Sequence, residues 1–487
     1  MNPEIRLFES STQSELDPND WDEFARLAHD ALDDALEYLR TVRTRRPWSP
    51  VPASVKEALS EPLPLAGQPI RAVYETFKKH ILPYPTGNIH PRFWGWVMGT
   101  GSPVGVIAEM LAATMNCHVA GYDQSAVLVE DTTLSWLKQL IRYPSGASGL
   151  LVSGGTAANL IGLTVARHAA DSKIRAHGIN GSRMTVYASS ETHSWAKRSC
   201  ELLGLGQENL RLIPVNDAFQ IDCLKLSNRV KEDRRDGFRP FCVIGNAGTV
   251  NTGAVDDLKT LAKFCQSENL WLHIDGAFGA LAAISDRLWP LVQGIEEAHS
   301  IAFDLHKWGY VPYEIGCVLV RDGQIHKDTF ATTPHYLAAL PGGIAREPLV
   351  FADLGIQLSR GFRALKLWMA LKCQGSDAWR RSIEKNYDQA QRLVRLILLQ
   401  PELELLSPAP LNVVNFRYRG LGSDSELDVI NQQILVRLQS EGIAVPSSTV
   451  LNGRFSIRVA HTNHRSTDAD FDALLDATLA FGRDLSK

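Results

Sequence analysis

Short apolar runs that alternate with helical stretches fill residues 87–375, and this alternation constrains the fold more than any other feature of the chain. GLLV at 149–152, MTVYAS at 184–189 and LWLHI at 270–274 are examples. Runs without regularly spaced polar residues are typical of strands buried on both faces, joined by helical crossovers. The pattern predicts an α/β fold with a large, doubly wound, mainly parallel sheet.

Two different segments flank this region. Residues 1–86 contain an amphipathic pattern from Pro18 to Arg43 and then a proline-rich stretch, with few apolar clusters. We therefore expect a helical arm that packs on another surface. Residues 376–487 combine two helical patterns with the strand-like runs LNVVNFRY and RFSIRVAH, which predicts a small α+β domain. The expected organisation is thus arm (1–86), large domain (87–375) and small domain (376–487).

Composition excludes several classes of partner. The formal net charge of −4 gives no basic field for nucleic acid or an anionic membrane. No apolar run approaches the roughly 18 to 20 residues that span a bilayer. The seven cysteines are widely spaced without a C-x-x-C pair, so neither a disulfide framework nor a metal site is indicated. With no signal-like N-terminus, we expect a soluble cytoplasmic protein.

Polar residues follow the ends of five predicted strands. Because carboxyl ends of parallel strands meet at one edge of a sheet, these residues are expected to share a site. The first group, Ser153-Gly154-Gly155-Thr156, opens a helix and could bind a phosphate, although such a turn is more often only a turn. The remaining residues are His193, Thr249, Asp275 and Lys307.

Each of these residues has an ordinary structural interpretation when taken alone. His193 could be a residue of a helix N-terminus, Asp275 a helix N-cap and Lys307 a solvated strand end. Together they match the needs of pyridoxal 5′-phosphate: an anion site, a stacking partner, a carboxylate for the pyridine nitrogen and an amine for a Schiff base. The combination predicts a binding site for this cofactor.

Several segments resemble, in the same order, the group II pyridoxal-phosphate-dependent amino-acid decarboxylases, which include aromatic-L-amino-acid, histidine, glutamate and cysteine-sulfinate decarboxylases. The segments are SGGTAANL, ETHSWAKRS, NAGTVNTGAVDDL, LWLHIDGAFG, FDLHKWGYVPYEIGCVLVRD and DLGIQLSRGFRALKLWMALKCQG. The resemblance extends from about residue 20 to the C-terminus. It implies the aspartate-aminotransferase-like fold type I and a homodimer with active sites at the interface, around which the N-terminal arm would wrap.

The resemblance also implies roles for single residues. It assigns Lys307 to the Schiff base, Asp275 to the pyridine nitrogen and His193 to stacking on the ring. The other implied cofactor positions are Gly155 and Thr156 at the phosphate, Thr249 near the cofactor hydroxyl or the substrate carboxylate, Ala277 on the second ring face and His306 beside the lysine. Many members have Asn three residues before the lysine. Here that residue is Asp304, whose charge would repel a phosphate unless it faces away or is bridged, and its role stays open.

The implied reaction converts an L-amino acid to its amine and carbon dioxide through the Lys307 Schiff base and a quinonoid intermediate. Tyr336 lies 29 residues after Lys307. The resemblance places it on a loop that reaches the active site of the neighbouring subunit, where Tyr336 protonates Cα. Relatives with phenylalanine at this position form an aldehyde instead. A lyase or aldolase, an aldehyde-forming deaminase and a cofactor-binding protein without activity are the alternatives.

The substrate side chain is not identified by the sequence. Trp96, Val97 and Met98 occupy the segment that lines the substrate pocket in the family. Asn116 and His118 are expected to come from the partner subunit. Arg458 matches an arginine that binds a substrate carboxylate in the glutamate and cysteine-sulfinate branch, but other branches have an arginine there too. Aromatic and acidic substrates therefore both stay open.

Overall fold

The computed structural model describes residues 16–179, 181–332, 340–345 and 350–487, so Tyr336 lies outside the described residues. The chain forms two compact units. The first contains the described residues of Met1–Arg45 together with Ser49–Pro85, and the second contains Arg46–Trp48 and Thr86–Lys487.

The first unit is helical. Its α-helices are α1 (Trp21–Arg40), α2 (Ala53–Ala58) and α3 (Ile70–Thr76). Asp20 caps α1, since its side chain accepts a hydrogen bond from the Glu23 backbone amide at 2.9 Å. Tyr74 of α3 donates to Asp34 of α1 at 2.7 Å, which fixes these two helices against each other.

The second unit contains a seven-stranded mixed sheet with strand order β2-β8-β7-β6-β5-β3-β4. The strands are β2 (Ser148–Val152), β3 (Met184–Ser189), β4 (Leu210–Ile213), β5 (Arg239–Asn246), β6 (Trp271–Asp275), β7 (Ser300–Asp304) and β8 (Gly316–Val320). All neighbouring pairs are parallel except the two that β8 makes with β2 and β7. The large, mainly parallel sheet predicted from the alternating runs and the fold type I implied by the resemblance are both confirmed.

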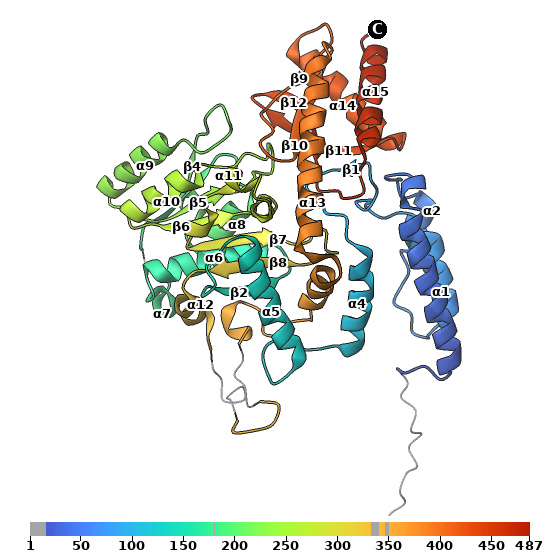
Figure 1. The fold of residues 1–487 in the computed structure, drawn as a ribbon, viewed down its shortest axis with the longest axis horizontal. Helices are drawn as coiled ribbons and strands as arrows, with labels where there is room; N and C mark the ends of the chain where they lie inside the picture. Colours follow the sequence, from blue (N-terminus) through green and yellow to red (C-terminus); the bar gives the residue numbers. More distant parts are fainter. Residues whose placement is uncertain (1–15, 180, 333–339, 346–349) are drawn as a thin grey trace, which may run out of the picture. The chain divides into compact units, whose positions relative to one another are not determined.

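Helices between the strands cover this sheet (Figure 1). The helix α6 packs across β5, β6, β7 and β8, whereas α9 and α10 pack on β5 and α5 packs on β2. Their bounds are α5 (Ser125–Leu140), α6 (Gly155–Ala170), α8 (Trp195–Leu202), α9 (Cys223–Arg235), α10 (Leu258–Ser267) and α12 (Gly323–Phe330). Apart from the edge strand β4, the sheet strands are almost wholly buried, which explains their continuous apolar sequences.

The direction of the strands decides where the site can lie. Because β8 is antiparallel to both β7 and β2, these two strands run the same way. The carboxyl ends of β2, β3, β5, β6 and β7 therefore meet at one edge of the sheet. All of the polar segments selected from the sequence follow these ends.

A second sheet of this unit has the strand order β1-β11-β12-β10-β9. Its strands are β1 (Phe93–Trp94), β9 (Leu403–Leu405), β10 (Val413–Tyr418), β11 (Val445–Leu451) and β12 (Arg454–Ala460). The helices α14 (Asp424–Ser440) and α15 (Asp468–Leu485) pack on it. The short β1 pairs with β11, so a segment from the start of the expected large domain joins the C-terminal sheet.

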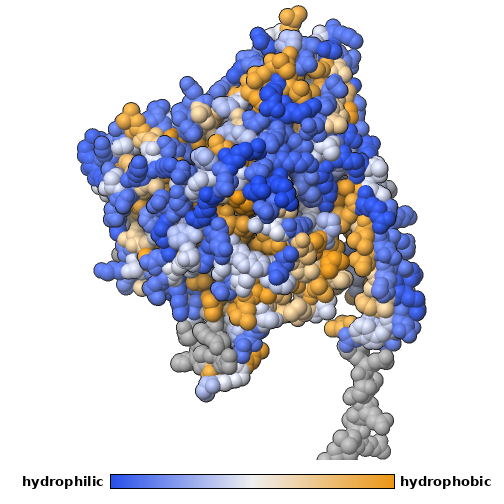
Figure 2. Space-filling model, viewed as in Figure 1, coloured by the Kyte–Doolittle hydropathy of each residue, from blue (hydrophilic) through white to orange (hydrophobic). Residues whose placement is uncertain are grey.

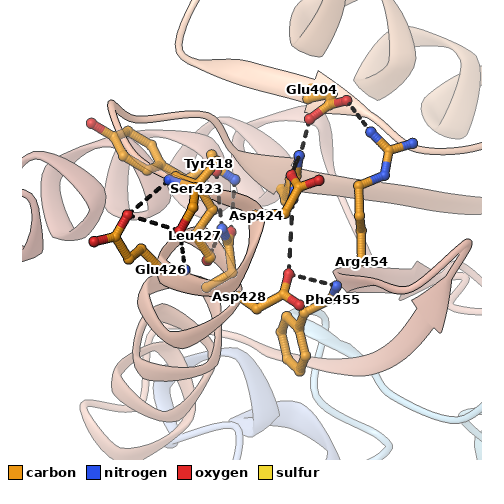
Figure 3. Close-up of polar contacts among 11 residues, drawn as sticks. Glu404, Tyr418, Ser423, Asp424, Glu426, Leu427, Asp428, Arg454 and Phe455 are labelled. Atoms are coloured by element: carbon orange, nitrogen blue, oxygen red, sulfur yellow. Dashed lines mark hydrogen bonds and ion pairs between the residues drawn. The ribbon is translucent and has the colours of Figure 1, made fainter.

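Ion pairs connect the elements of this smaller sheet. The buried Arg417 of β10 donates to Glu404 of β9 at 2.8 Å and to Asp424 of α14 at 2.6 Å. Glu404 also accepts from Arg454 of β12 at 2.7 Å (Figure 3). One acidic side chain thus holds two neighbouring arginines and fixes β9 against β10 and β12.

The helix α13 (Ala364–Leu399) runs through the expected boundary between the large and small domains. At Gly375 it is interrupted by a residue with φ of 74°, a conformation that glycine adopts without steric cost. The division at residues 375 and 376 stays a prediction. Within the described residues no helix is long and apolar enough to cross a membrane, and all seven cysteines are free thiols. The cytoplasmic location also stays a prediction.

Candidate active site

A cavity of about 320 Å³ lies at the carboxyl edge of the large sheet. Its wall contains Trp96, Val97, Ser153, Gly154, Gly155, Thr156, Ala157, Asn159, His193, Trp195, Asn246, Gly248, Thr249, Val250, Asp275, Ala277, Phe278, Asp304, His306, Lys307 and Glu314. The structure thus brings together polar residues from all five predicted strand ends. A second hollow, of about 420 Å³ beside Trp136 and Arg142, contains none of them, so the first cavity is the candidate active site.

The glycine turn forms one wall of the cavity. Gly154 is the N-cap of α6 and Gly155 its first residue. A Cβ atom on Gly155 would lie 2.8 Å from Asp304 Oδ2, and one on Gly154 would lie 3.1 Å from His306 Cε1. Glycine is therefore required for this close approach. The amides of the first turn and the positive end of the helix dipole make the turn suitable for an anion.

Asp275 lies at the end of β6 and is 6% exposed. Its Oδ1 accepts a hydrogen bond from the Ala277 backbone amide at 3.0 Å. Its Oδ2 accepts from Trp195 Nε1 at 2.6 Å. Two donors hold the carboxylate in one orientation at the cavity wall, because hydrogen bonds to a charged acceptor are strong.

His193 follows β3 and also lines the cavity. Its Nδ1 accepts a hydrogen bond from the Trp195 backbone amide at 3.2 Å. Burial lowers the pKa of His193, and the neighbouring Asp275 opposes this shift only in part. The ring is therefore mainly neutral at pH 7.

Lys307 and His306 follow β7 and meet Asp304, the last residue of that strand. Lys307 Nζ lies 2.8 Å from Asp304 Oδ2, and His306 Nε2 lies 3.8 Å from the same oxygen. Burial lowers the pKa of His306, whose Nδ1 accepts from the Ile315 backbone amide at 3.1 Å. The amine of Lys307 is thus the cation that pairs with Asp304.

Trp96 and Val97, which precede the strands of the large sheet in the sequence, also line the cavity. Both have left-handed backbone conformations, with φ of 53° and 65°. This conformation is rare for residues with a side chain and especially unfavourable for a β-branched one. Such strain concentrates at functional sites, where the surrounding structure maintains it.

The remaining predicted site residues differ in whether they line the cavity. Thr249 and Ala277 line the cavity, whereas Met98, Asn116, His118 and Arg458 do not. Arg458 is buried and donates to the Val250 and Asn251 carbonyl oxygens and to Ser447 Oγ. Tyr336 lies outside the described residues. The roles of these residues stay predictions.

The wall residues that were not selected from the sequence include Trp195, Asn246, Phe278 and Glu314. Asn246 ends β5 directly beside Asp275 of β6, so the rule that selected the other strand ends could have found it. Trp195 and Phe278 each lie a few residues after a selected strand end. Glu314 carries no such signal, because it precedes β8.

Residues 52–419 match the family profile described as pyridoxal-dependent decarboxylase conserved domain. The chain belongs to the pyridoxal-dependent decarboxylase family. The chain is 33% identical over 470 residues to an aromatic-L-amino-acid decarboxylase of Bacillus atrophaeus, with 96% of each chain covered. It is 28% identical over 481 residues to a phenylacetaldehyde synthase of Petunia hybrida, with 94% of each covered. The predicted family is confirmed.

Solved structures of the family share the fold. The crystal structure of Oryza sativa TDC with PLP and tryptamine superimposes with a TM-score of 0.90 at 24% identity, covering 97% of this chain and 100% of that one. Because the identity is only 24%, this likeness establishes the fold alone. It agrees with the two sheets of the second unit.

Pyridoxal 5′-phosphate is the cofactor of this decarboxylase family. The cavity offers a group of suitable chemistry for each part of it. The glycine turn at Gly154 and Gly155 suits the phosphate, the fixed Asp275 carboxylate suits the pyridine nitrogen, and the Lys307 amine suits the aldehyde. The carboxylate of Asp304 lies beside the glycine turn, where its charge opposes a phosphate.

Proposed function

We propose that this protein removes the α-carboxyl group of an uncharged L-amino acid as carbon dioxide and releases the amine. The proposal is carried by one observation. The Lys307 amine, the Asp275 carboxylate, the His193 ring and the Gly154–Gly155 turn all face a single cavity. Membership of the decarboxylase family supports the type of reaction.

Some cavity residues would bind the cofactor, and Asp275 would control the charge of its ring. When bound, pyridoxal phosphate supplies a conjugated, positively charged ring that takes up the electron pair left by the departing carboxyl group. Asp275 holds a proton at the ring nitrogen, because a nearby negative charge favours the protonated form. His193 packs on the ring, Gly155 and Thr156 hold the phosphate, and Lys307 binds the cofactor aldehyde.

Tyr336 is the proposed proton donor to Cα after carbon dioxide leaves. The proposal rests on its position 29 residues after Lys307 and on its Pro334-His335-Tyr336-Leu337 context. A positioned phenol can transfer a proton to a carbon that carries developing negative charge. Without such a donor, oxygen can react at the same carbon, and an aldehyde is the product.

An uncharged substrate side chain agrees best with the described cavity wall. Trp96, Val97 and Phe278 contribute apolar surface. The guanidinium of Arg458, which would be needed for an acidic side chain, is already bound to two carbonyl oxygens and a hydroxyl. We infer an aromatic L-amino acid, in line with the name of the Bacillus atrophaeus relative.

The functional form is proposed to be a homodimer. Figure 2 shows hydrophobic residues gathered over α4 (Pro103–Met115) and α5. Met110, Leu111 and Met115 of α4 and Leu128 of α5 are between 41% and 68% exposed. Contiguous exposed apolar surface marks an interaction site. In the first unit Trp21 is 64% exposed, which agrees with an arm that covers a partner.

The purified protein with added pyridoxal phosphate tests the proposed reaction. Each natural L-amino acid is supplied separately, and carbon dioxide, amine, aldehyde and hydrogen peroxide are quantified. We expect equal amounts of amine and carbon dioxide from an aromatic substrate, and no product from Lys307→Ala. That variant should also lose the visible absorbance and the borohydride-trapped cofactor of the wild type. Aldehyde and peroxide without amine would establish an oxidative deaminase instead.

A further inference from the structure

Asp304 is a buried carboxylate at the positive end of a helix. It is 1% exposed. Its backbone is fixed by a hydrogen bond of 2.9 Å from its amide N–H to the Ala277 carbonyl oxygen. A Cβ on Gly155 would lie 2.8 Å from its Oδ2, and a Cβ on Gly316 would lie 2.8 Å from its Oδ1. The glycines of the turn and of β8 therefore leave room for this side chain at the N-terminus of α6.

The charge of Asp304 is only partly compensated. Its Oδ2 contacts Lys307 Nζ at 2.8 Å, whereas its buried Oδ1 has no hydrogen-bond partner among the described residues. His306, with Nε2 at 3.8 Å, is kept neutral because burial lowers its pKa. Cys317 and Tyr313 nearby are also neutral, because burial raises the pKa of each. The more distant His193 is neutral for the same reason as His306.

Among the described residues, the cation that pairs with Asp304 is the Lys307 amine, which is the group assigned to the cofactor. Bonding of Lys307 to the cofactor aldehyde would take this amine from Asp304, and the carboxylate would then lose its partner. The cofactor phosphate then brings further negative charge to the same helix N-terminus. Two anions that share one desolvated region repel each other, because buried charges are weakly screened.

We propose that Asp304 is a determinant of cofactor affinity: it opposes the phosphate group and makes this chain exchange its cofactor with the surrounding solution. The inference rests on the proposed assignment of Lys307 and the glycine turn. It explains a residue whose charge the proposed reaction does not otherwise use. It also predicts that the effect depends on the phosphate and not on the pyridine ring.

Equilibrium binding of two aldehydes tests this role without an activity assay. Cofactor-free wild type and Asp304→Asn are titrated with pyridoxal 5′-phosphate and, separately, with pyridoxal, which lacks the phosphate. Binding is followed by the visible absorbance of the Lys307-bound aldehyde. Loss of the Asp304–Lys307 ion pair favours the binding of both aldehydes. The ratio of the two dissociation constants therefore reports the contribution of the phosphate group. We expect Asp304→Asn to shift this ratio by about ten-fold or more in favour of the phosphate form.

Glu314→Gln is the matched control. It removes the same charge from the same cavity wall, but Glu314 is half-exposed and paired with Arg363 rather than placed against α6. Its ratio should stay within about three-fold of wild type, because exposed charges are screened. Asp304→Ser provides a second uncharged variant, for which the same shift as in Asp304→Asn is expected.

The outcomes separate this inference from the proposed function. An unchanged ratio in Asp304→Asn and Asp304→Ser, with visible absorbance present, would overturn the role of Asp304 alone. An equal shift in Glu314→Gln would also overturn it, since the effect would then be one of overall charge. Absence of Lys307-dependent absorbance in the wild type with either aldehyde would instead overturn the proposed cofactor attachment.

Discussion

Trp195 Nε1 donates a hydrogen bond of 2.6 Å to Oδ2 of Asp275. The donor is the first residue of α8 and the acceptor is the last residue of β6, so the contact joins elements 80 residues apart in sequence. Trp195 is 2% exposed and its ring also contacts His273 edge-on. An indole can donate but not accept, so this contact holds Oδ2 of Asp275 in one position as an acceptor.

Trp195→Phe tests the importance of this hydrogen bond. The phenyl ring keeps apolar packing but removes the N–H group, so the Asp275 carboxylate is held by the Ala277 amide alone. A hydrogen bond to a charged group contributes about 1.5–3 kcal/mol, which predicts that kcat falls about 10-fold to 100-fold. KM should change little, because Asp275 acts on the cofactor and not on the substrate.

Trp271→Phe is the control for the loss of a buried indole. Among the described residues the donors to the Asp275 carboxylate are Trp195 and Ala277, whereas Trp271 Nε1 donates to Ser300 Oγ at 2.8 Å. Its kcat should stay near the wild-type value. If both variants lost activity equally, or if Trp195→Phe changed only the thermal stability, a positioning role for Trp195 would be wrong.

Asp275→Asn should be more severe than Trp195→Phe. An amide has the size of the carboxylate but no negative charge, so it cannot hold a proton at the pyridine nitrogen. Removal of a fixed charge at a reacting system predicts a loss of about 1,000-fold in kcat, together with weaker cofactor retention. Asp275→Glu keeps the charge and should retain more activity. Turnover near wild type in the asparagine variant, measured with saturating cofactor, would exclude this role.

The strand ends could be predicted because local sequence determines them. Asp275 and Lys307 each follow an apolar run, and parallel strands place such ends at a common edge. The same reasoning omitted Trp195, because the direction of its N–H group depends on how α8 packs against β6. The residue lies only two positions after His193, but nothing in the local pattern distinguishes a donor from an ordinary core tryptophan.

Long-range pairings were also beyond the sequence pattern. The strand β1 has only two residues, Phe93 and Trp94, and pairs with β11 more than 350 positions later. Its burial depends on Trp94 stacking on Phe471 with ring centroids 4.7 Å apart. A two-residue strand has no periodicity, so it becomes recognisable only once the second sheet is assembled.

Tyr336→Phe should change the product. Loss of the phenol removes the proposed proton donor, so amine formation should fall while aldehyde, ammonia and hydrogen peroxide appear. The products are measured by mass spectrometry and a peroxidase-coupled assay. Amine formation at the wild-type rate would contradict the assignment.

Hybrid dimers test whether Tyr336 acts across the subunit interface. Lys307→Ala and Tyr336→Phe subunits are each expected to form no amine. In a mixed dimer, one of the two sites combines Lys307 of one subunit with Tyr336 of the other. Partial recovery of amine formation is expected once subunit exchange has been demonstrated. No recovery would mean that Tyr336 acts within its own subunit or not in this step.

Acid should destabilise the protein through three wholly buried histidines, His273, His326 and His461. Burial lowers their pKa values to about 3, 4 and 3. In the unfolded chain each has an ordinary pKa near 6.5, so between that value and the folded pKa the unfolded state binds more protons. Stability therefore rises with pH and is lost as the pH falls below about 6.5, by up to about 4 kcal/mol per pH unit near pH 5.

His326→Gln isolates one of these contributions. His326 bonds to Ser148 Oγ at 2.6 Å and to the Leu354 carbonyl oxygen at 2.8 Å, and a glutamine amide offers the same acceptor and donor without titrating. Urea unfolding between pH 5 and 7 should show a slope smaller by about 1.4 kcal/mol per pH unit. The exposed His29, changed to glutamine, is the control for loss of an imidazole. An unchanged slope in His326→Gln would show that this ring binds protons equally in the folded and unfolded states, against the shift that its burial predicts.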